Sequence, residues 1–172
     1  MAYDAFMWLE GPNSGKPVEG ETQDKAMSAH KAFEVFSFSF GASNPVTIGS
    51  TAGGAGGGKV SISSFNVMKK TDSASPGLFL NCCMGAHFDK AEVVLRKAGG
   101  QAVEYIKYHF GTVFVESVQW SGSSGGDDTP TESVSFAFGQ FTLEYLPQTA
   151  KGAGGSKPMT ADWDLVKNAQ NS

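Results

Sequence analysis

The chain has 172 residues, a length that suits one domain with a substantial core and is short for two. Its net charge of -4 and the scatter of its 13 lysines and arginines exclude the basic stripe of a typical nucleic-acid-binding protein. Charged residues make up 17% of the chain against a usual ~25%, and 22 residues are glycine. This composition favours a protein that hides part of its surface in an assembly.

The chain carries no sign of a disulfide framework or of a membrane segment. Cys82 and Cys83 are neighbours, too constrained to form an ordinary disulfide, which predicts folding in a reducing compartment. Residues 1–12 contain Asp4 and Glu10 and lack the basic and apolar regions of a signal peptide. No stretch reaches the ~20 apolar residues of a membrane span, so we expect no stable membrane insertion.

Alternating side chains predict strands in the first part of the chain. Residues 3–10 form the first predicted strand, and the polar, Gly- and Pro-rich residues 11–26 form an exposed loop. Residues 33–40 form the second predicted strand. Its aromatic face, which we expect to be core but which could also line a ligand pocket, consists of Phe36, Phe38 and Phe40.

Residues 41–58 are too long and too rich in glycine for a hairpin turn, so we expect a loop that is functional or disordered. A strand over 59–69 follows, with a break in its alternation at Ser63 and Ser64 that indicates a β-bulge.

One short helix is predicted over 75–85. Ser75 suits the N-cap, Pro76 the first helical position and Gly85 the stop. An apolar stripe on this helix is expected to plug one mouth of a barrel and consists of Leu78, Phe79, Cys82 and Cys83.

Residues 91–119 predict three strands joined by a hairpin and a corner, with apolar residues on both faces of the sheet. Such a sheet needs cover on both faces, which favours a barrel that also packs against other molecules. A loop over 121–129 leads to a long strand over 132–145, where a change of phase at Gly139 indicates a bulge or barrel corner. The fold class we predict is mainly β: a small antiparallel β-barrel with one short helix and extended loops.

We expect a single domain over residues 1–172. Within it, residues 151–158 are linker-like, and residues 159–172 form a C-terminal strand and tail, with Trp163, Leu165 and Val166 in the strand.

Several motifs match enzymes by their letters alone. Residues 53–59 fit part of a phosphate-binding loop but precede a predicted strand, where that loop needs a helix. Ser124 sits in a GxSxG pattern without the strand-turn-helix of a nucleophile elbow, so a hydrolase using Ser124 is a minor alternative. The histidines and cysteines lack zinc-site spacing, and we expect solvated carboxylates rather than a cation site in the acidic pairs Asp127–Asp128 and Asp162–Asp164. We therefore expect no enzyme activity, no cofactor and no metal.

A set of motifs in common order resembles the haemolysin-coregulated protein (Hcp) family, the tube subunit of type VI secretion. The matching residues are Phe36-Ser37-Phe38-Ser39-Phe40-Gly41, Gly58-Lys59-Val60, Lys69 with Asp72, Pro76, Leu78, Cys82, Gly85 and His87, Arg96-Lys97-Ala98-Gly99-Gly100 with Glu104-Tyr105, Ser124 to Asp128 with Thr131-Glu132, and Tyr145 with Pro147-Gln148. Together they cover roughly residues 3–166, and the loop over 11–26 is long for the family.

The resemblance implies a hexameric ring, with rings stacking into a tube. The implied partners are other copies of the chain, a spike protein, a contractile sheath that expels the tube, and effectors carried in its lumen. It also implies a protein that stays in the bacterial cytoplasm before firing and leaves without a signal peptide. A monomeric β-barrel that carries a small ligand is the alternative.

Two glycine-rich segments are the candidate interface between subunits or rings, because glycine permits close approach of a neighbouring backbone. Their residues are Gly41, Pro45, Val46, Ile48, Gly53, Gly54, Gly56, Gly57, Gly58, Ser124, Gly125, Asp127 and Asp128. The cargo, the cognate spike and the residues that line the lumen do not follow from the sequence.

Overall fold

The structure, a computed structural model, describes residues 3–48, 56–98, 102–126, 128–149, 155 and 157–171. Within these ranges the chain is mainly β, with one α-helix and one short 3-10 helix. In chain order the elements are β1 (Tyr3–Asn13), η1 (Met27–His30), β2 (Phe33–Glu34), β3 (Ser37–Ser39), β4 (Ala42–Ser43), β5 (Val46–Thr47), β6 (Gly56–Gly57), β7 (Ser61–Ile62), β8 (Phe65–Lys70), α1 (Ser75–Met84), β9 (His87–Lys97), β10 (Glu104–Ser121), β11 (Thr131–Tyr145) and β12 (Met159–Asp164). No helix in the described part of the chain is long and apolar enough to cross a membrane.

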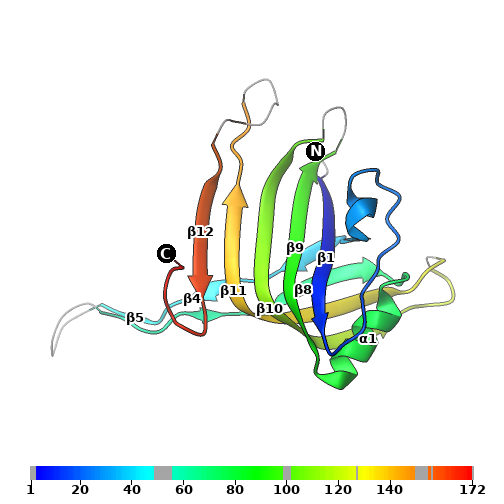
Figure 1. Ribbon diagram of the computed structural model, residues 1–172, viewed down its shortest axis with the longest axis horizontal. Helices are drawn as coiled ribbons and strands as arrows, with labels where there is room; N and C mark the ends of the chain where they lie inside the picture. The colour runs from blue at the N-terminus through cyan, green and yellow to red at the C-terminus, as the bar shows by residue number, and fades with distance from the viewer. Residues whose placement is uncertain are drawn as a thin grey trace.

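The long strands curl into an antiparallel barrel (Figure 1). The strand order is β2-β1-β9-β10-β11-β8-β3, and β12 pairs with the half of β11 that β8 leaves free. The two end strands, β2 and β3, belong to one extended segment, residues 33–39. The Val35 amide donates to the Ala5 carbonyl of β1 at 2.9 Å, and the Phe36 amide donates to the Met68 carbonyl of β8 at 2.8 Å. This segment ties both ends of the sheet together, which confirms the predicted barrel.

The crossing of residues 33–39 from β1 to β8 changes which side chains face inward. Phe33 and Val35 are buried, and Phe38 and Phe40 pack against the same core, but Phe36 is 51% exposed. The prediction that Phe36 shares a face with Phe38 and Phe40 is therefore wrong, because the strand changes partner between Val35 and Phe36 and its alternation breaks there.

Side chains fill the interior of the barrel. The inward face of β9 supplies Phe88 and several small or branched residues. Aromatic rings from four other segments pack against one another, mostly edge-to-face or tilted, with centroids 4.8 to 6.4 Å apart where they meet Phe40, Phe65 or Phe110. The residues of this aromatic cluster are Phe38, Phe40, Phe65, Tyr108, Phe110, Phe138 and Phe141.

A second apolar cluster lies on the outside of β1 and β9. Phe6, Trp8 and Val94 are buried there beneath Met27 and Ala32, which belong to residues 14–32, here called the strap. The apolar second face of the sheet is therefore partly covered by the chain itself. The sequence pattern correctly indicated a need for cover, but it did not show that the strap supplies part of it.

A kink inside β10 replaces the predicted corner between two strands. Thr112 has φ +50°, in the left-handed region, and beside it a Cβ on Gly111 would lie 2.8 Å from the Gln140 side chain. Pairing with β11 continues on both sides of the kink, so residues 91–119 contain two strands rather than three. Gly139 faces the kink across the ladder, which confirms a corner there.

The helix forms where it was predicted, with Gly85 in the left-handed conformation at its end. Ser75, however, is not the N-cap, because Ala74 occupies that position and Ser75 lies inside the first turn. Leu78 is fully buried and Cys82 packs on the core, whereas Phe79 and Cys83 face solvent. The predicted four-residue stripe is therefore only half correct.

Candidate assembly surfaces

The described residues 41–48 and 56–63 form a two-stranded ribbon that projects away from the barrel (Figure 1), and the segment 41–63 is here called the arm. Its strands β4 and β7 pair with each other, as do β5 and β6, and neither pair belongs to the barrel sheet. The Gly58 amide donates to the Pro45 carbonyl at 2.8 Å, and a Cβ on Gly58 would lie 2.7 Å from the Pro45 ring. Only glycine fits at this point of the ribbon.

The predicted loop over 41–58 is thus a paired ribbon in its described part, and Ser63 and Ser64 mark the junction between the arm and the barrel rather than a β-bulge. The Ser63 amide donates to the Gly41 carbonyl at 2.9 Å, which closes the base of the arm. The sequence did not reveal this pairing, because the segment is rich in glycine and alternation is hard to detect in strands of two residues.

The arm exposes apolar side chains. Val46 is 59% exposed and Ile48 is 86% exposed, and Gly41, Pro45, Gly56, Gly57 and Gly58 are also exposed. Gly53 and Gly54 lie outside the described residues.

The other predicted interface segment joins β10 to β11. Ser124, Gly125 and Asp128 are exposed in this loop, and Asp127 lies outside the described residues. Thr71, just past the end of β8, donates its amide to the Pro130 carbonyl at 2.9 Å. Since the arm leaves β8 at its other end, the structure does not bring the two predicted segments together but places them at opposite ends of β8.

The enzyme motifs lack the geometry that their chemistry needs. Lys59 is followed by β7 instead of a helix, and Ser124 lies in a connection between two antiparallel strands. Asp164 accepts the backbone amide of Lys167 at 2.8 Å and a bond from Gln140, which lower the pKa of its carboxyl. Among the described residues there is no group of three or more His, Cys, Asp or Glu side chains that could hold a metal ion.

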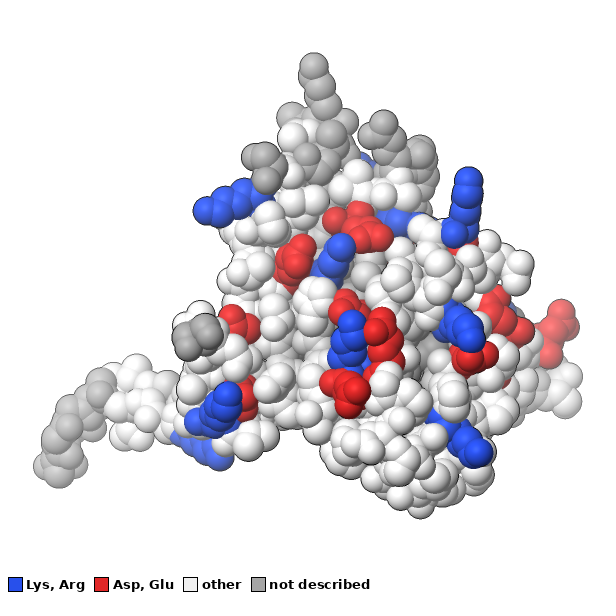
Figure 2. Space-filling view, in the orientation of Figure 1, with Lys and Arg blue, Asp and Glu red and all other residues white. Residues whose placement is uncertain are grey.

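Acidic and basic side chains gather on the outer face of β9, β10 and β11 (Figure 2). In their midst His109 lies between two carboxylates, with Nδ1 2.6 Å from Glu92 and Nε2 3.6 Å from Glu144. The hydrogen bond with Glu92, together with the charges of both carboxylates, raises the pKa of His109 above 6.5 against the opposing effect of burial. Lys107 pairs with Glu104 at 2.8 Å on the same face.

A buried ion pair joins β8 to β11 beneath the start of α1. The Lys69 ammonium donates to Glu132 at 2.6 Å and to Asp72 at 2.7 Å, and both Lys69 and Glu132 are fully buried. Glu132 also accepts bonds from Ser75 at 2.8 Å and from the Trp120 indole at 2.7 Å. Lys69 and Asp72 stood out in the sequence as parts of a family pattern, but nothing in the sequence pointed to their burial.

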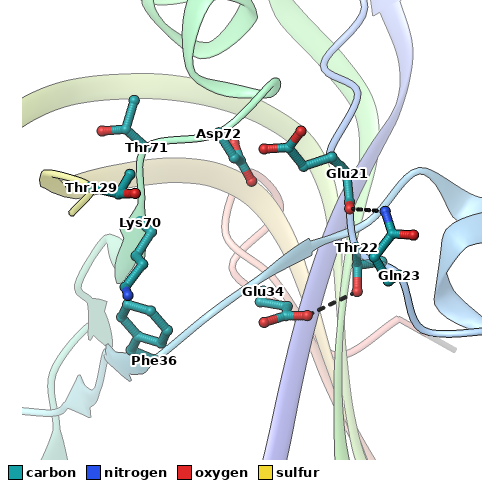
Figure 3. A pocket seen from close by; sticks show the side chains of 9 residues that line it. All are labelled: Glu21, Thr22, Gln23, Glu34, Phe36, Lys70, Thr71, Asp72 and Thr129. Carbon is teal, nitrogen blue, oxygen red and sulfur yellow. Dashed lines mark hydrogen bonds between the residues drawn. The ribbon is translucent and has the colours of Figure 1, made fainter. Parts of the chain in front are cut away.

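A pocket of about 300 Å³ opens beside this network (Figure 3). Residues from the strap, from β2 and the segment after it, from the turn after β8 and from the β10–β11 loop line it: Glu21, Thr22, Gln23, Glu34, Phe36, Lys70, Thr71, Asp72 and Thr129. The Lys70 ammonium lies 5.9 Å from the centre of the exposed Phe36 ring. Sequence reasoning missed this pocket because its walls come from distant segments.

Comparisons with known proteins agree with the barrel, the helix and the order of motifs. A family model described as type VI secretion system effector, Hcp, matches residues 6–145, from β1 to the end of β11. Protein Hcp1 of Pseudomonas aeruginosa is 37% identical over 113 residues, which cover 65% of this chain and 69% of that protein.

Solved structures share the whole fold. A structure described as a type six secretion system protein matches with a TM-score of 0.88 and 33% identity, over 99% of this chain and 100% of that one. Hcp1 from Salmonella typhimurium matches with a TM-score of 0.76 and 31% identity, over 99% and 100% of the two chains. The chain therefore belongs to the Hcp family of type VI secretion system proteins.

Proposed function

We propose that the protein is the structural subunit of a type VI secretion tube. Six copies form a ring, and the rings stack into a tube that carries effectors in its lumen. A contractile sheath expels this tube behind a spike protein, moving it from the bacterial cytoplasm out of the cell. The protein itself makes and breaks no bond, and family membership is the observation that carries the proposal.

The filled barrel supports a structural role over the alternative of a ligand carrier. A carrier barrel needs an interior space, whereas Phe65, Phe110 and Phe136 occupy the interior here and are almost wholly buried. Of the three aromatic residues that could have lined a ligand pocket inside the barrel, Phe38 and Phe40 pack against this same core, and Phe36 is exposed and lines the outer pocket beside β8 instead.

The arm supports assembly through copies of the same chain. Its strands pair only with each other among the described elements, and it exposes Val46 and Ile48. A projecting apolar ribbon of this kind is stabilised when it lies on another molecule. We assign the contacts between subunits or rings to the arm and to the loop that holds Ser124, Gly125 and Asp128.

Electron microscopy of the purified protein tests the proposed function. Negative-stain images should show rings with sixfold end views, and at higher protein concentration side views of stacked rings. Particles without rotational symmetry at every concentration would contradict the ring, and rings that never stack even with the spike present would contradict the tube.

Replacing residues 42–62 by a short turn tests the role of the arm. Because the described strands of the arm pair only with each other, the barrel should keep its circular dichroism spectrum while rings or stacked rings disappear. A milder variant replaces Val46 and Ile48 by alanine and should weaken assembly to a smaller extent. Unchanged rings and tubes after removal of the arm would show that the arm has no role in assembly.

A further inference from the structure

The pocket beside β8 contains negative charge that its own chain leaves without a partner. The Glu21 carboxylate has no hydrogen bond or ion pair among the described residues, and Glu34 accepts only the Thr22 hydroxyl, at 3.1 Å. Asp72 is already paired with the buried Lys69. Lys70 is the one cation that lines the pocket, and it lies over the Phe36 ring (Figure 3).

The composition of the pocket suits a basic side chain. Two carboxylates provide acceptors for an ammonium group, and the exposed Phe36 ring, over which Lys70 already lies, provides an apolar wall for the methylene chain of an incoming lysine. The volume of about 300 Å³ accommodates one long side chain together with part of the backbone beside it.

The arm carries one charged residue in residues 41–63, and this residue is Lys59. Lys59 is exposed and has no ion pair within the described part of the chain. Gly57 and Gly58 precede it, and because they have no side chains, another molecule can approach the backbone beside Lys59 closely. The arm and the pocket are therefore complementary in charge.

One chain cannot bring these two features together. The arm leaves β8 at Phe65, while the pocket begins at Lys70 at the other end of the same strand. Six strand residues span about 20 Å, at ~3.3 Å each. The arm also extends away from the barrel (Figure 1). Two complementary surfaces at opposite ends of one subunit give a head-to-tail contact, the kind that closes rings or builds helical and stacked arrays.

We propose that Lys59 in the arm of one copy docks in the pocket of a neighbouring copy, between Glu21 and Glu34 and against Phe36. This inference rests on the proposed assembly and names the surface that receives the arm. Lys59 provides the charge, and the glycines before it allow the close approach.

A charge exchange tests the docking. Lys59→Glu and Glu21→Lys each place like charges together, and each should raise the subunit concentration needed for half-assembly by about tenfold or more. The double variant Lys59→Glu/Glu21→Lys restores opposite charges and should recover most of the loss. The matched control Lys157→Glu makes the same change of charge outside the arm and should leave assembly within about twofold of the wild type.

Mixed cysteine variants test the contact directly, in a chain with Cys82 and Cys83 replaced by serine. One variant carries Lys59→Cys and the other carries Glu21→Cys. Oxidation of the mixture should give a covalent dimer on a non-reducing gel, and oxidation of either variant alone should give little, because the disulfide needs the two sites to come together.

The results separate the docking from the proposed function. If the wild type forms rings or tubes but neither charge reversal weakens them and the mixture gives no covalent dimer, the docking is wrong and the tube function stands. If the wild type never assembles, the proposed function itself fails. Loss in both single variants, recovery in the double variant and a covalent dimer in the mixture would together establish the contact.

Discussion

Lys69 is a fully buried cation with acceptors on several sides. It donates to Glu132, Asp72, the Ser75 hydroxyl at 3.3 Å and the Lys70 carbonyl at 2.8 Å. Breaking such a pair by removing one partner leaves an uncompensated charge in the interior. The network therefore fixes the turn between β8 and α1 against β11.

Lys69→Met should lower the free energy of unfolding by ~3 to 5 kcal/mol, because Glu132 stays buried without its cation. Urea denaturation at a fixed subunit concentration measures the change. Lys70→Met is the matched control: Lys70 is exposed, so its replacement should change the free energy by only ~0.5 kcal/mol. Equal midpoints for both variants would show that the buried pair does not stabilise the fold.

His109 should make stability depend on pH. Its pKa in the folded state lies above 6.5, chiefly because of the hydrogen bond with Glu92. The protonated histidine therefore stabilises the fold fully below pH ~6.5, and this stabilisation is lost as the pH rises through the folded-state pKa. His109→Gln should flatten the dependence of unfolding free energy on pH above ~6.5.

Two partner variants rank the contributions to the His109 pKa. Glu92→Gln should reduce the pH dependence more than Glu144→Gln, since Nδ1 lies 2.6 Å from Glu92 and Nε2 lies 3.6 Å from Glu144. The opposite order, or no change in either variant, would contradict the assigned cause.

At the scale of elements, one ion pair joins the strap to β9. Arg96 donates from both terminal nitrogens to Asp24, which also accepts the Met27 amide at 3.0 Å. The Arg96 guanidinium and this amide hold the pKa of Asp24 well below its usual range. Asp24 thus fastens the strap to β9 and accepts the amide of the first residue of η1.

Asp24→Ala should release the strap from β1 and β9 without unfolding the barrel. Hydrogen exchange measured by mass spectrometry should become faster in residues 22–32. The exchange rates in β10 and β11 should stay unchanged, because the barrel remains folded. Lys25→Ala, the exposed neighbour, is the control. In the wild type the same anchor should weaken progressively as the pH falls below ~4, the ordinary carboxyl pKa, and should be lost only as the pH falls through the much lower pKa of Asp24 in the folded state. Protected amides in the strap of Asp24→Ala would exclude this anchor.

The sequence predicted correctly those elements whose ends are marked by nearby residues. The helix over 75–84 has Pro76 near its start and Gly85 after its end, and both signals act within a few residues. The strand over 33–40 is different, because its inward face depends on a change of partner between Val35 and Phe36. The pairing of the arm and the use of the strap as cover depend in the same way on contacts between distant segments.

For the candidate surfaces too, the sequence indicated local features but not contacts between distant segments. Glycine content and the order of motifs pointed to the arm and to the loop that holds Ser124, and these remain predictions as interface residues. The acidic pocket needed Glu21, Glu34 and Phe36 to meet in space, and no spacing in the sequence indicates that meeting. The double contact of His109 with Glu92 and Glu144 likewise depends on the register of three strands.

At the scale of the whole molecule, the subunit has two unlike ends. The arm extends from one end of β8 (Figure 1), and the pocket beside β8 lies at the other end, together with the β10–β11 loop. A subunit of this form is suited to head-to-tail association, in which every copy makes the same contact with the next. Sixfold closure of that contact is the central claim of the proposed function.

The absolute mass in solution, measured by light scattering behind a sizing column, tests that claim most directly. Six chains of 18.1 kDa give a ring of about 109 kDa, and we predict this species, with heavier stacked species as the concentration rises. A single species of 18.1 kDa that persists at high protein concentration would contradict a preassembled ring.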